Sequence, residues 1–294
     1  MNSAKEISFK ENGNFINIKG ESFSINFDKA NGLLNNYVFN GIVLIEKGSQ
    51  VNFWRAPNDN DYGANTQIKN REWKTAGKTE EVKSSIQKIS KNEIEIIFVK
   101  NIFDGDAVYT QTYRIYGDGN IKISNDFNVI KGEHKHLYKF GNELVLPESY
   151  KRITWYGKGP MEAYADRQHA AKVGLYKSTV ADQYYAYIRP QETGNKLDVR
   201  WVKLLRNDGS GIKIYGEKLL NVSALNFSRE DLDSGKRKTQ KHAGELTSRK
   251  EVYLNVDGFQ QGLGSINSWG AKPLDPYMLP YQSYHYSYWI VPVK

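Results

Sequence analysis

The chain has 294 residues, 39% of them hydrophobic and 25% charged, which is enough apolar material for one large β domain or two ordinary domains and excludes a disordered chain. It has no cysteine, which excludes disulfides, thiolate metal sites and a cysteine nucleophile. The formal net charge of +8 comes from scattered lysines rather than from a basic stripe. Only Lys236, Arg237, Lys238 and Lys241 gather densely, and we expect an exposed loop there and no binding to nucleic acid.

No apolar run approaches the length that crosses a membrane, so we expect no membrane contact. The first ten residues also lack the apolar centre of a signal peptide, although such a signal could have been removed from a precursor. We therefore expect a soluble chain, and the composition leaves its compartment open between cytoplasm and periplasm.

Apolar and polar residues alternate with a period of two over most of the chain, which indicates strands with one buried face. Asn40-Gly41 and Gly117-Asp118-Gly119 separate such segments and predict tight hairpins. In chain order, the predicted strands cover residues 23–27, 37–39, 42–45, 94–99, 108–116, 121–129, 137–146, 152–156, 199–205, 212–215, 252–256 and 284–291.

Helix signals are few and short. Residues 67–75 are predicted to form one helix, a capping box from Ser228 to Asp231 begins a second, and residues 160–167 could form a third. No repeat and no long flexible linker divides the chain, so we expect one domain over residues 1–294, with residues 1–20 leading into it. A dozen or more antiparallel strands in one unit predict an all-β fold, a large sandwich.

The stretch from Asn255 to Trp269 combines an apolar strand with a loop that has glycines at 258, 262 and 264. Glycines permit positive φ angles and close backbone approach, so this loop can be compact. Trp269 lies at its far end among small and polar residues, where an indole would suit stacking on the apolar face of a sugar. Alternatively, Trp269 folds back and covers the core, as most tryptophans do, and the spacing alone favours that reading.

Residues 52–61 end in a dense turn of Asp and Asn. Asp59, Asp61 and Gly63 faintly resemble a calcium loop, but the further ligands of that motif are missing. We therefore favour hydrogen bonds within the turn, with Arg55 paired to one of the aspartates, over a metal site.

Three other side chains have residue types that occur in catalytic or metal sites. His134 and His136 are predicted to share one face of a strand, which without a third ligand is weak evidence for zinc, so we favour surface positions. Glu143 follows an Asn, as the acid/base of many glycosidases does. Because the strand pattern continues beyond it, we interpret Glu143 as a structural residue.

Residues 155–167 and 187–195 are rich in polar and aromatic side chains. Six of them could converge in a cleft or, as we favour, form a buried hydrogen-bond network that ties long loops to the sandwich: Glu162, Asp166, Arg167, Gln191, Glu192 and Asn195. Retaining glycosidases need two carboxylates about 5–5.5 Å apart, and the spacing singles out no such pair.

Four motifs occur together in this chain: Asn-Phe-Trp-Arg-Ala-Pro-x-Asp-Asn-Asp-Tyr-Gly at 52–63, Trp-Tyr-Gly-x-Gly-Pro-x-Glu-x-Tyr-x-Asp-Arg at 155–167, Pro-Gln-Glu-x-Gly-Asn at 190–195, and Asp-Gly-Phe-x-x-Gly-x-Gly with Ser-Trp at 257–269. From about Phe23 to Val291 the chain resembles the C-terminal small-chain domain of the long β-galactosidases of glycoside hydrolase family two. Only Asn58, where Thr is common, departs from this pattern.

The resemblance implies an antiparallel β-supersandwich of the galactose-mutarotase-like superfamily. It also implies that both catalytic glutamates lie on a separate TIM-barrel domain, so this chain should hold no catalytic residue and no metal. Members of the family bind magnesium and sodium, so the resemblance implies these ions as possible cofactors of the complete enzyme, not of this chain. In that family the tryptophan at the position of Trp269 stacks on the sugar in the barrel's active site, so the resemblance favours a sugar-binding role for Trp269.

We therefore expect the C-terminal domain or a small subunit of a β-galactosidase, silent alone, with the TIM barrel and a β-galactoside as partners. A rival reading is an aldose mutarotase, which needs a Glu base and a His acid in one cleft; Glu192 with His169 or His285 are the candidates. Another rival is a free carbohydrate-binding module that uses Trp269 and surface tyrosines and binds glycans without a partner.

Overall fold

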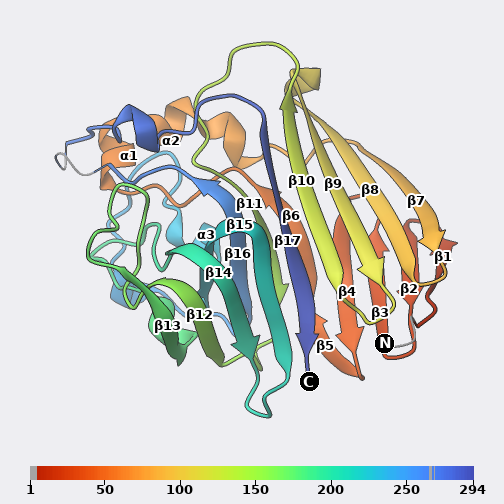
Figure 1. The fold of residues 1–294 in the computed structure, drawn as a ribbon. Coiled ribbons are helices and arrows are strands. Elements are labelled where there is room, and N and C mark those ends of the chain that lie inside the picture. Colours follow the sequence, from red (N-terminus) through yellow and green to blue (C-terminus); the bar gives the residue numbers. More distant parts are fainter. Residues whose placement is uncertain (1–4, 265–266, 268) are drawn as a thin grey trace.

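The computed structural model describes residues 5–264, 267 and 269–294. In this part of the chain, 17 strands form one curled sheet that folds over itself as a two-layered sandwich (Figure 1). Every strand pair is antiparallel. The predicted all-β antiparallel fold is confirmed.

One layer begins with the six N-terminal strands and continues through two strands from later in the chain. In order across the sheet it contains β1 (Ser8–Asn12), β2 (Phe15–Lys19), β3 (Phe23–Asp28), β4 (Leu33–Phe39) with its hairpin partner β5 (Ile42–Ile45), β6 (Lys47–Asn52), β11 (Lys139–Leu146) and β16 (Val252–Gln260). Residues 1–20 were predicted to lead into the domain. Within that segment, residues 8–12 and 15–19 form strands of this layer.

The other layer lies in front of the first in Figure 1. It contains β7 (Val82–Ser90), β8 (Glu93–Ile102), β9 (Ala107–Tyr116), β10 (Ile121–Val129) and β17 (Tyr284–Val293).

The long strand β15 (Gly211–Leu225) joins the two layers. Its first half pairs with β17 of the front layer, and its second half pairs with β16 of the back layer. β14 (Lys196–Leu205) pairs along β15, and β12 (Arg152–Gly159) and β13 (Lys172–Thr179) extend the sheet beyond it. The layers are therefore parts of one continuous sheet.

The core lies between the layers and is rich in aromatic rings. Phe53 stacks on Phe140 with ring centroids 5.6 Å apart, and Phe27 of β3 meets the edge of Tyr113 of β9 at 4.8 Å. These side chains are almost fully buried, and burial of one such side chain contributes about 1.5–3 kcal/mol to folding.

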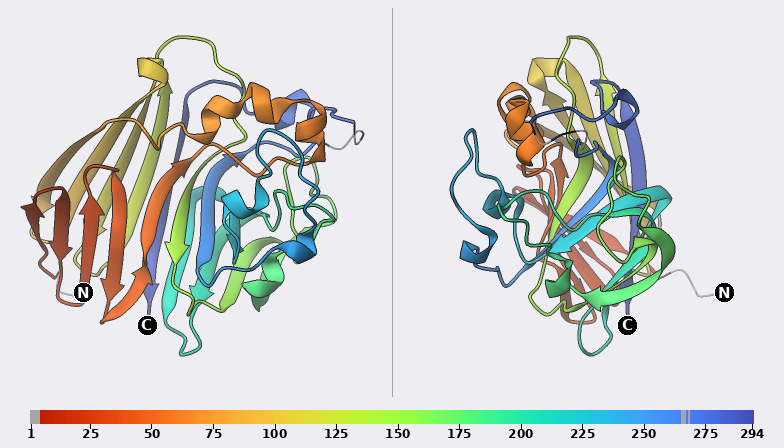
Figure 2. Two further views of the ribbon diagram at one scale, coloured as in Figure 1. Left: turned by 180° about the vertical axis from the view of Figure 1, so that it is seen from behind. Right: turned by 90° about the vertical axis from the view of Figure 1, so that its left-hand side faces the viewer.

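Short helices connect the strands. One end of the sandwich carries α1 (Asp59–Gly63), α2 (Thr66–Lys69), η1 (Arg71–Lys74), η2 (Phe103–Gly105) and η5 (Asp275–Tyr277) (Figure 2). The others are η3 (Ala181–Gln183), α3 (Arg229–Leu232) and η4 (Ala243–Glu245). Among the residues that the structure describes, no helix is long and apolar enough to cross a membrane.

Two of the three predicted helices are confirmed. α2 and η1 cover most of residues 67–75, and Ser228 caps α3 through a capping box with Asp231. Both predicted hairpin turns are also present; at the first, Asn40 and Gly41 have φ angles of 49° and 75°.

The predicted helix at 160–167 is wrong. The amide of Ala163 donates to the carbonyl of Asn195 at 2.9 Å, and Tyr164 and Arg167 exchange hydrogen bonds across a tight turn. These backbone groups have partners outside a helical pattern, so the segment follows the neighbouring loop instead.

Candidate functional site

The segments that carry the four motifs meet at the end of the sandwich where α1 and α2 lie. The loop after β16 contacts Arg55 of the first motif and Asp166 of the second, and the amide of Glu192 in the third donates to the carbonyl of Ala56 at 3.1 Å. Segments up to 207 residues apart in sequence thus form one polar cluster.

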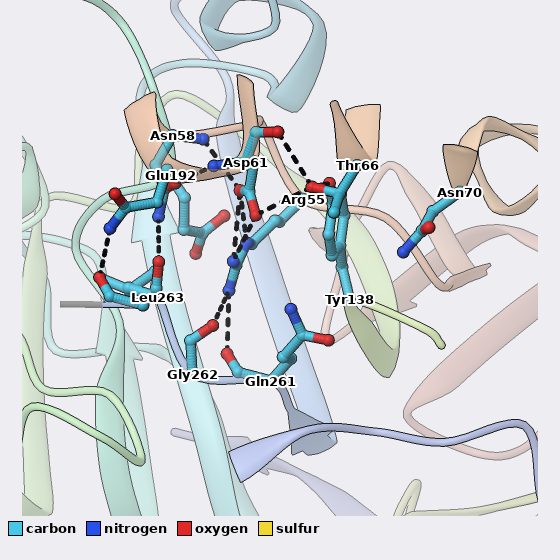
Figure 3. A network of polar contacts seen from close by, with 12 residues as sticks. Arg55, Asn58, Asp61, Thr66, Asn70, Tyr138, Glu192, Gln261, Gly262 and Leu263 are labelled. Atoms are coloured by element: carbon cyan, nitrogen blue, oxygen red, sulfur yellow. Dashed lines mark hydrogen bonds and ion pairs between the residues drawn. The ribbon is translucent and has the colours of Figure 1, made fainter. Parts of the chain in front are cut away.

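Arg55 is the centre of this cluster (Figure 3). Its guanidinium is fully buried and forms a two-pronged ion pair with Asp61, at 3.3 Å from Nε and 3.1 Å from Nη2. Nη1 donates to the carbonyls of Gln261 at 2.9 Å and Gly262 at 3.0 Å. The predicted Arg–Asp pair is confirmed, and it has the additional effect of holding the loop after β16.

Helix α1 fixes the next residues of the same loop. Asn58 caps this helix and its Nδ2 donates to the carbonyl of Leu263 at 2.8 Å, while Asn60 Nδ2 donates to the carbonyl of Gly264 at 2.6 Å. On the other side, Asp166 accepts hydrogen bonds from the amides of Leu263 at 2.9 Å and Gly264 at 2.8 Å. Residues 261–264 therefore have partners on both sides.

Trp269 lies five residues after this anchored segment. Asn267 Oδ1 accepts hydrogen bonds from the amides of Trp269 at 3.0 Å and Ala271 at 3.2 Å. Gly270 has a φ of 97° and touches the backbone of Gly63; a Cβ on Gly63 would lie 2.7 Å from the Cα of Gly270. Trp269 itself is 86% exposed, so it does not cover the core. Its role as a sugar-binding residue stays a prediction.

A cleft of about 340 Å³ opens beside the anchored loop. Gln191 and Glu192 line it together with α1 residues Asp59 and Asn60 and with Leu263. The cleft offers amide and carboxylate groups next to an exposed indole loop, which is the kind of surface that hydroxyl-rich ligands require.

The six polar residues expected at 155–167 and 187–195 divide between the cleft and a hydrogen-bond network. Glu162 accepts hydrogen bonds from Arg167, Tyr187, Thr193 at 3.2 Å and the amide of Gly194 at 2.7 Å. The network therefore ties the two loops together, as the sequence indicated.

Two more residues of this set, Asn195 and Glu192, tie these loops to neighbouring segments. Asn195 Nδ2 donates to the carbonyl of Ala163 at 2.7 Å, and Glu192 Oε1 accepts from Gln260 at 3.1 Å. Arg167, Gln191 and Glu192 also line the cleft. The two expectations are thus compatible, because the network forms one wall of the cleft.

Sequence reasoning missed a buried ion pair at the base of the loop. Lys139 of β11 and Asp257 of β16 lie 2.8 Å apart with both side chains almost fully buried. Burial, opposed by Lys139, raises the pKa of Asp257 to about 6. Gly141 leaves room for this carboxylate, because a Cβ there would lie 1.7 Å from Asp257 Oδ1. The sequence signal was weak, because each strand holds other polar residues besides Lys139 and Asp257.

The histidine prediction is wrong in its geometry. His134 and His136 lie between β10 and β11, outside any strand. His134 contacts Glu72 at 3.1 Å and Asp106 at 3.0 Å, and burial lowers the pKa of His136 to about 4. The segment takes this shape because the His134 ring pairs with Glu72 and Asp106, and Asn70 Nδ2 donates to the backbone carbonyl of His136 at 2.9 Å.

The acidic candidates lie as the sequence suggested. Glu143 is a residue of β11, and Asp59 pairs with Arg189 at 3.0 Å and with Lys238 of the basic loop at 2.8 Å. Asp61 is neutralised by Arg55. Within residues 5–264, 267 and 269–294, no group of three or more His, Asp or Glu side chains could hold a metal ion.

The structure does not bring the mutarotase candidates together. Glu192 lines the cleft, whereas His169 lines a different cavity and His285 pairs with Asp126 on β10 at 2.7 Å. The acid and base that such chemistry needs are therefore not formed by these three residues.

The curled antiparallel sandwich with its polar loops at one end is the fold of the galactose mutarotases and aldose epimerases. A putative aldose 1-epimerase from Escherichia coli K12 aligns with 97% of this chain and 99% of its own, with a TM-score of 0.52 and 7% identity. The galactosidase domain of the α-galactosidase-sucrose kinase AgaSK aligns with 97% of this chain and 41% of its own, with a TM-score of 0.53 and 9% identity. Identities this low show the fold alone.

The chain belongs to the β-galactosidase small chain family, which it matches over residues 19–290. A β-galactosidase of Priestia megaterium is 31% identical over 275 residues, 93% of this chain and 26% of that protein. A β-galactosidase of Lactobacillus delbrueckii subsp. bulgaricus is 32% identical over 264 residues, 87% and 25%. The chain spans about a quarter of the length of these curated relatives.

Proposed function

We propose that this chain is the C-terminal part of a β-galactosidase and completes, with Trp269, an active site whose catalytic glutamates lie on a TIM-barrel domain. The observation that carries the proposal is an 86% exposed tryptophan five residues after the segment 261–264, whose backbone Arg55 and Asp166 hold. Anchoring of this segment lowers the entropy that substrate binding would otherwise cost, and an exposed indole supplies a flat apolar surface for a sugar ring.

The carboxylates of the cluster support a binding role rather than a catalytic one. Glu162 accepts four hydrogen bonds, Asp166 holds two backbone amides, and Asp61 is paired with Arg55. A general acid must give up a proton and a nucleophile must have a free lone pair, so side chains committed in this way are poorly suited to either task. Trp269 would then use remote binding energy to position the substrate.

The test is hydrolysis of a chromogenic β-galactoside by this chain alone and after mixing with the barrel-containing remainder of its enzyme. The chain alone should be silent, and mixing should restore turnover. In the restored enzyme, Trp269→Ala should raise KM roughly tenfold, the equivalent of about 1.4 kcal/mol, with a smaller change in kcat.

Trp201→Ala is the matched control. Trp201 is a half-buried tryptophan of β14 whose ring is covered by Lys203 and Lys213, and it is not among the residues of the cleft, so its loss should leave KM unchanged. Turnover by the isolated chain would contradict the proposal. Glycan affinity of the isolated chain that depends on Trp269 would instead favour a free carbohydrate-binding module.

A further inference from the structure

A second and larger cavity, of about 680 Å³, lies between β12, β13, β14 and the loop that follows η3. Its lining shares Arg167 and Tyr187 with the cleft beside Trp269, but most of its residues belong to other segments. A volume of this size is typical of pockets that hold small organic ligands.

Lys196 lines this cavity although it is only 4% exposed. Its ammonium has one weak hydrogen bond, to the carbonyl of Gly194 at 3.4 Å, and lies 5.2 Å from the centre of the Trp155 ring. A buried charge is normally paired, because removing it from water is costly.

The neighbouring carboxylates already have partners. Glu162 pairs with Arg167, Asp198 pairs with Lys158 at 3.1 Å, and Asp182 accepts a hydrogen bond from Thr179 at 2.6 Å. Within the part of the chain that the structure describes, no carboxylate forms an ion pair with Lys196.

Two other buried lysines show what a satisfied ammonium looks like in this protein. Lys139 pairs with Asp257 at 2.8 Å, and Lys100 donates to the carbonyl of Gly77 at 2.7 Å. Lys196 differs from both, because it lines a cavity and has neither an ion pair nor a short hydrogen bond; the nearby Glu162 carboxylate is paired with Arg167. Its missing partner can therefore come from a ligand.

The rest of the lining indicates the chemistry of that ligand. Lys177 and His169 add basic groups to the lining. The lining also holds three carboxylates, which already accept hydrogen bonds from other parts of the chain: Glu162, Asp166 and Asp182. The basic groups are therefore the ones left for a ligand, which favours an anion. Tyr185 and Tyr187 line the cavity with rings 4.8 Å apart, and Tyr185 is 61% exposed, so an aromatic surface is available for the apolar face of a sugar ring.

We propose that this cavity binds a monosaccharide that carries one anionic group, with the anion at the Lys196 ammonium and the ring against Tyr185. The anionic group is a carboxylate or a phosphate. Burial lowers the pKa of Lys196 to about 8, so the lysine is charged at neutral pH and a bound anion would stabilise that form. The proposal does not depend on the β-galactosidase activity.

Calorimetric titration of the 294-residue chain tests this directly. The probes are galacturonate for the carboxylate, galactose 6-phosphate for the phosphate, neutral galactose, and inorganic phosphate without a ring. At least one sugar anion should bind roughly tenfold or more tightly than galactose and than inorganic phosphate, and the comparison of the two anions identifies the group. Binding should weaken as the pH rises through about 8, where Lys196 loses its proton.

Lys196→Met should reduce this affinity roughly tenfold or more. Lys203→Met is the matched control, because Lys203 is also on β14 and also lies over a tryptophan ring, Trp201 at 5.6 Å, but is not part of the lining. Tyr185→Ala changes an exposed ring, keeps the buried part intact and should weaken binding without altering the fold.

The proposal is overturned if neither sugar anion binds better than galactose. It is also overturned if Lys196→Met and Tyr185→Ala, both folded by circular dichroism, bind the anion as tightly as the unaltered chain. A Lys196→Met variant that no longer binds the anion but still restores full turnover when mixed with the barrel-containing remainder would support this site independently of the role of Trp269.

Discussion

Arg55 and Lys196 are two buried cations with opposite surroundings. Arg55 has a carboxylate on one side and two backbone carbonyls on the other, whereas Lys196 has one carbonyl at 3.4 Å and an open cavity. A buried cation with a complete set of acceptors fixes the chain around it. A buried cation without such a set costs stability unless something else supplies the anion. The comparison separates a structural clamp from a candidate binding site.

The largest change in stability is expected when the Arg55 guanidinium is removed. Arg55→Met leaves the Asp61 carboxylate buried without its partner and should lower the free energy of unfolding by about 3–5 kcal/mol in urea titrations. The control is Arg114→Met, because Arg114 is half-exposed on β9 and its pair with Glu95 should contribute less than about 1 kcal/mol. Equal losses for both variants would show that Arg55 is not a clamp.

For Lys196, removal of the charge is expected to raise the free energy of unfolding rather than lower it. Lys196→Met should raise the free energy of unfolding at neutral pH by as much as about 3 kcal/mol, because the folded protein holds a lysine whose pKa is lowered from 10.5 to about 8. The full loss of folding free energy caused by burying the charged lysine applies below a pH of about 8. It disappears as the pH rises toward 10.5, where the unfolded chain also loses its proton, so the gain should shrink over this range. Destabilisation by Lys196→Met at neutral pH would contradict the assignment.

A smaller effect sharpens the description of the clamped loop. Asp166→Asn keeps one acceptor oxygen for two amides, so the free energy of unfolding should fall by about 1–2 kcal/mol. The structural change should be local to the amides of Leu263 and Gly264. Hydrogen exchange of these two amides should speed up more than exchange in the strands of the core. Uniform acceleration across the protein would mean that Asp166 does not act locally.

The smallest change in stability is expected at the tip of the same loop. Trp269→Ala should alter the free energy of unfolding by less than about 0.5 kcal/mol, because the ring is 86% exposed. A thermal unfolding curve is sufficient to check this. A large loss would mean that the indole packs on the core after all.

Much of the fold could be predicted because period-two alternation survives wherever one face of a strand is buried. Phe23, Ile25 and Phe27 show it plainly, and all three are core residues. β7 and β13 were missed because most of their side chains are at least partly exposed, which removes the apolar signal. β6 was missed because its burial involves Gly, Ser and Asn rather than large apolar residues.

The candidate site was predictable only in part. A short-range ion pair such as Arg55 with Asp61 can be anticipated from residues six positions apart. The contacts of Arg55 with residues 261 and 262, more than 200 positions away, depend on how the layers fold and leave no local pattern. Lys196 has the same limitation, since a lysine at the start of a strand looks like any surface residue until β12 and the neighbouring loops cover it.

The pairing of β15 with both layers has a consequence for how the chain acquires its structure. During synthesis, β1 to β14 emerge before the strand that connects the β7 to β10 sheet with the β6 and β11 sheet. Until residues 211–293 are available, β10 lacks its partner β17 and β11 lacks its partner β16, so each sheet has an unpaired edge. The nascent chain therefore passes through a long interval in which it is vulnerable to aggregation, and closure of the sandwich is a late event with contacts between residues far apart in sequence.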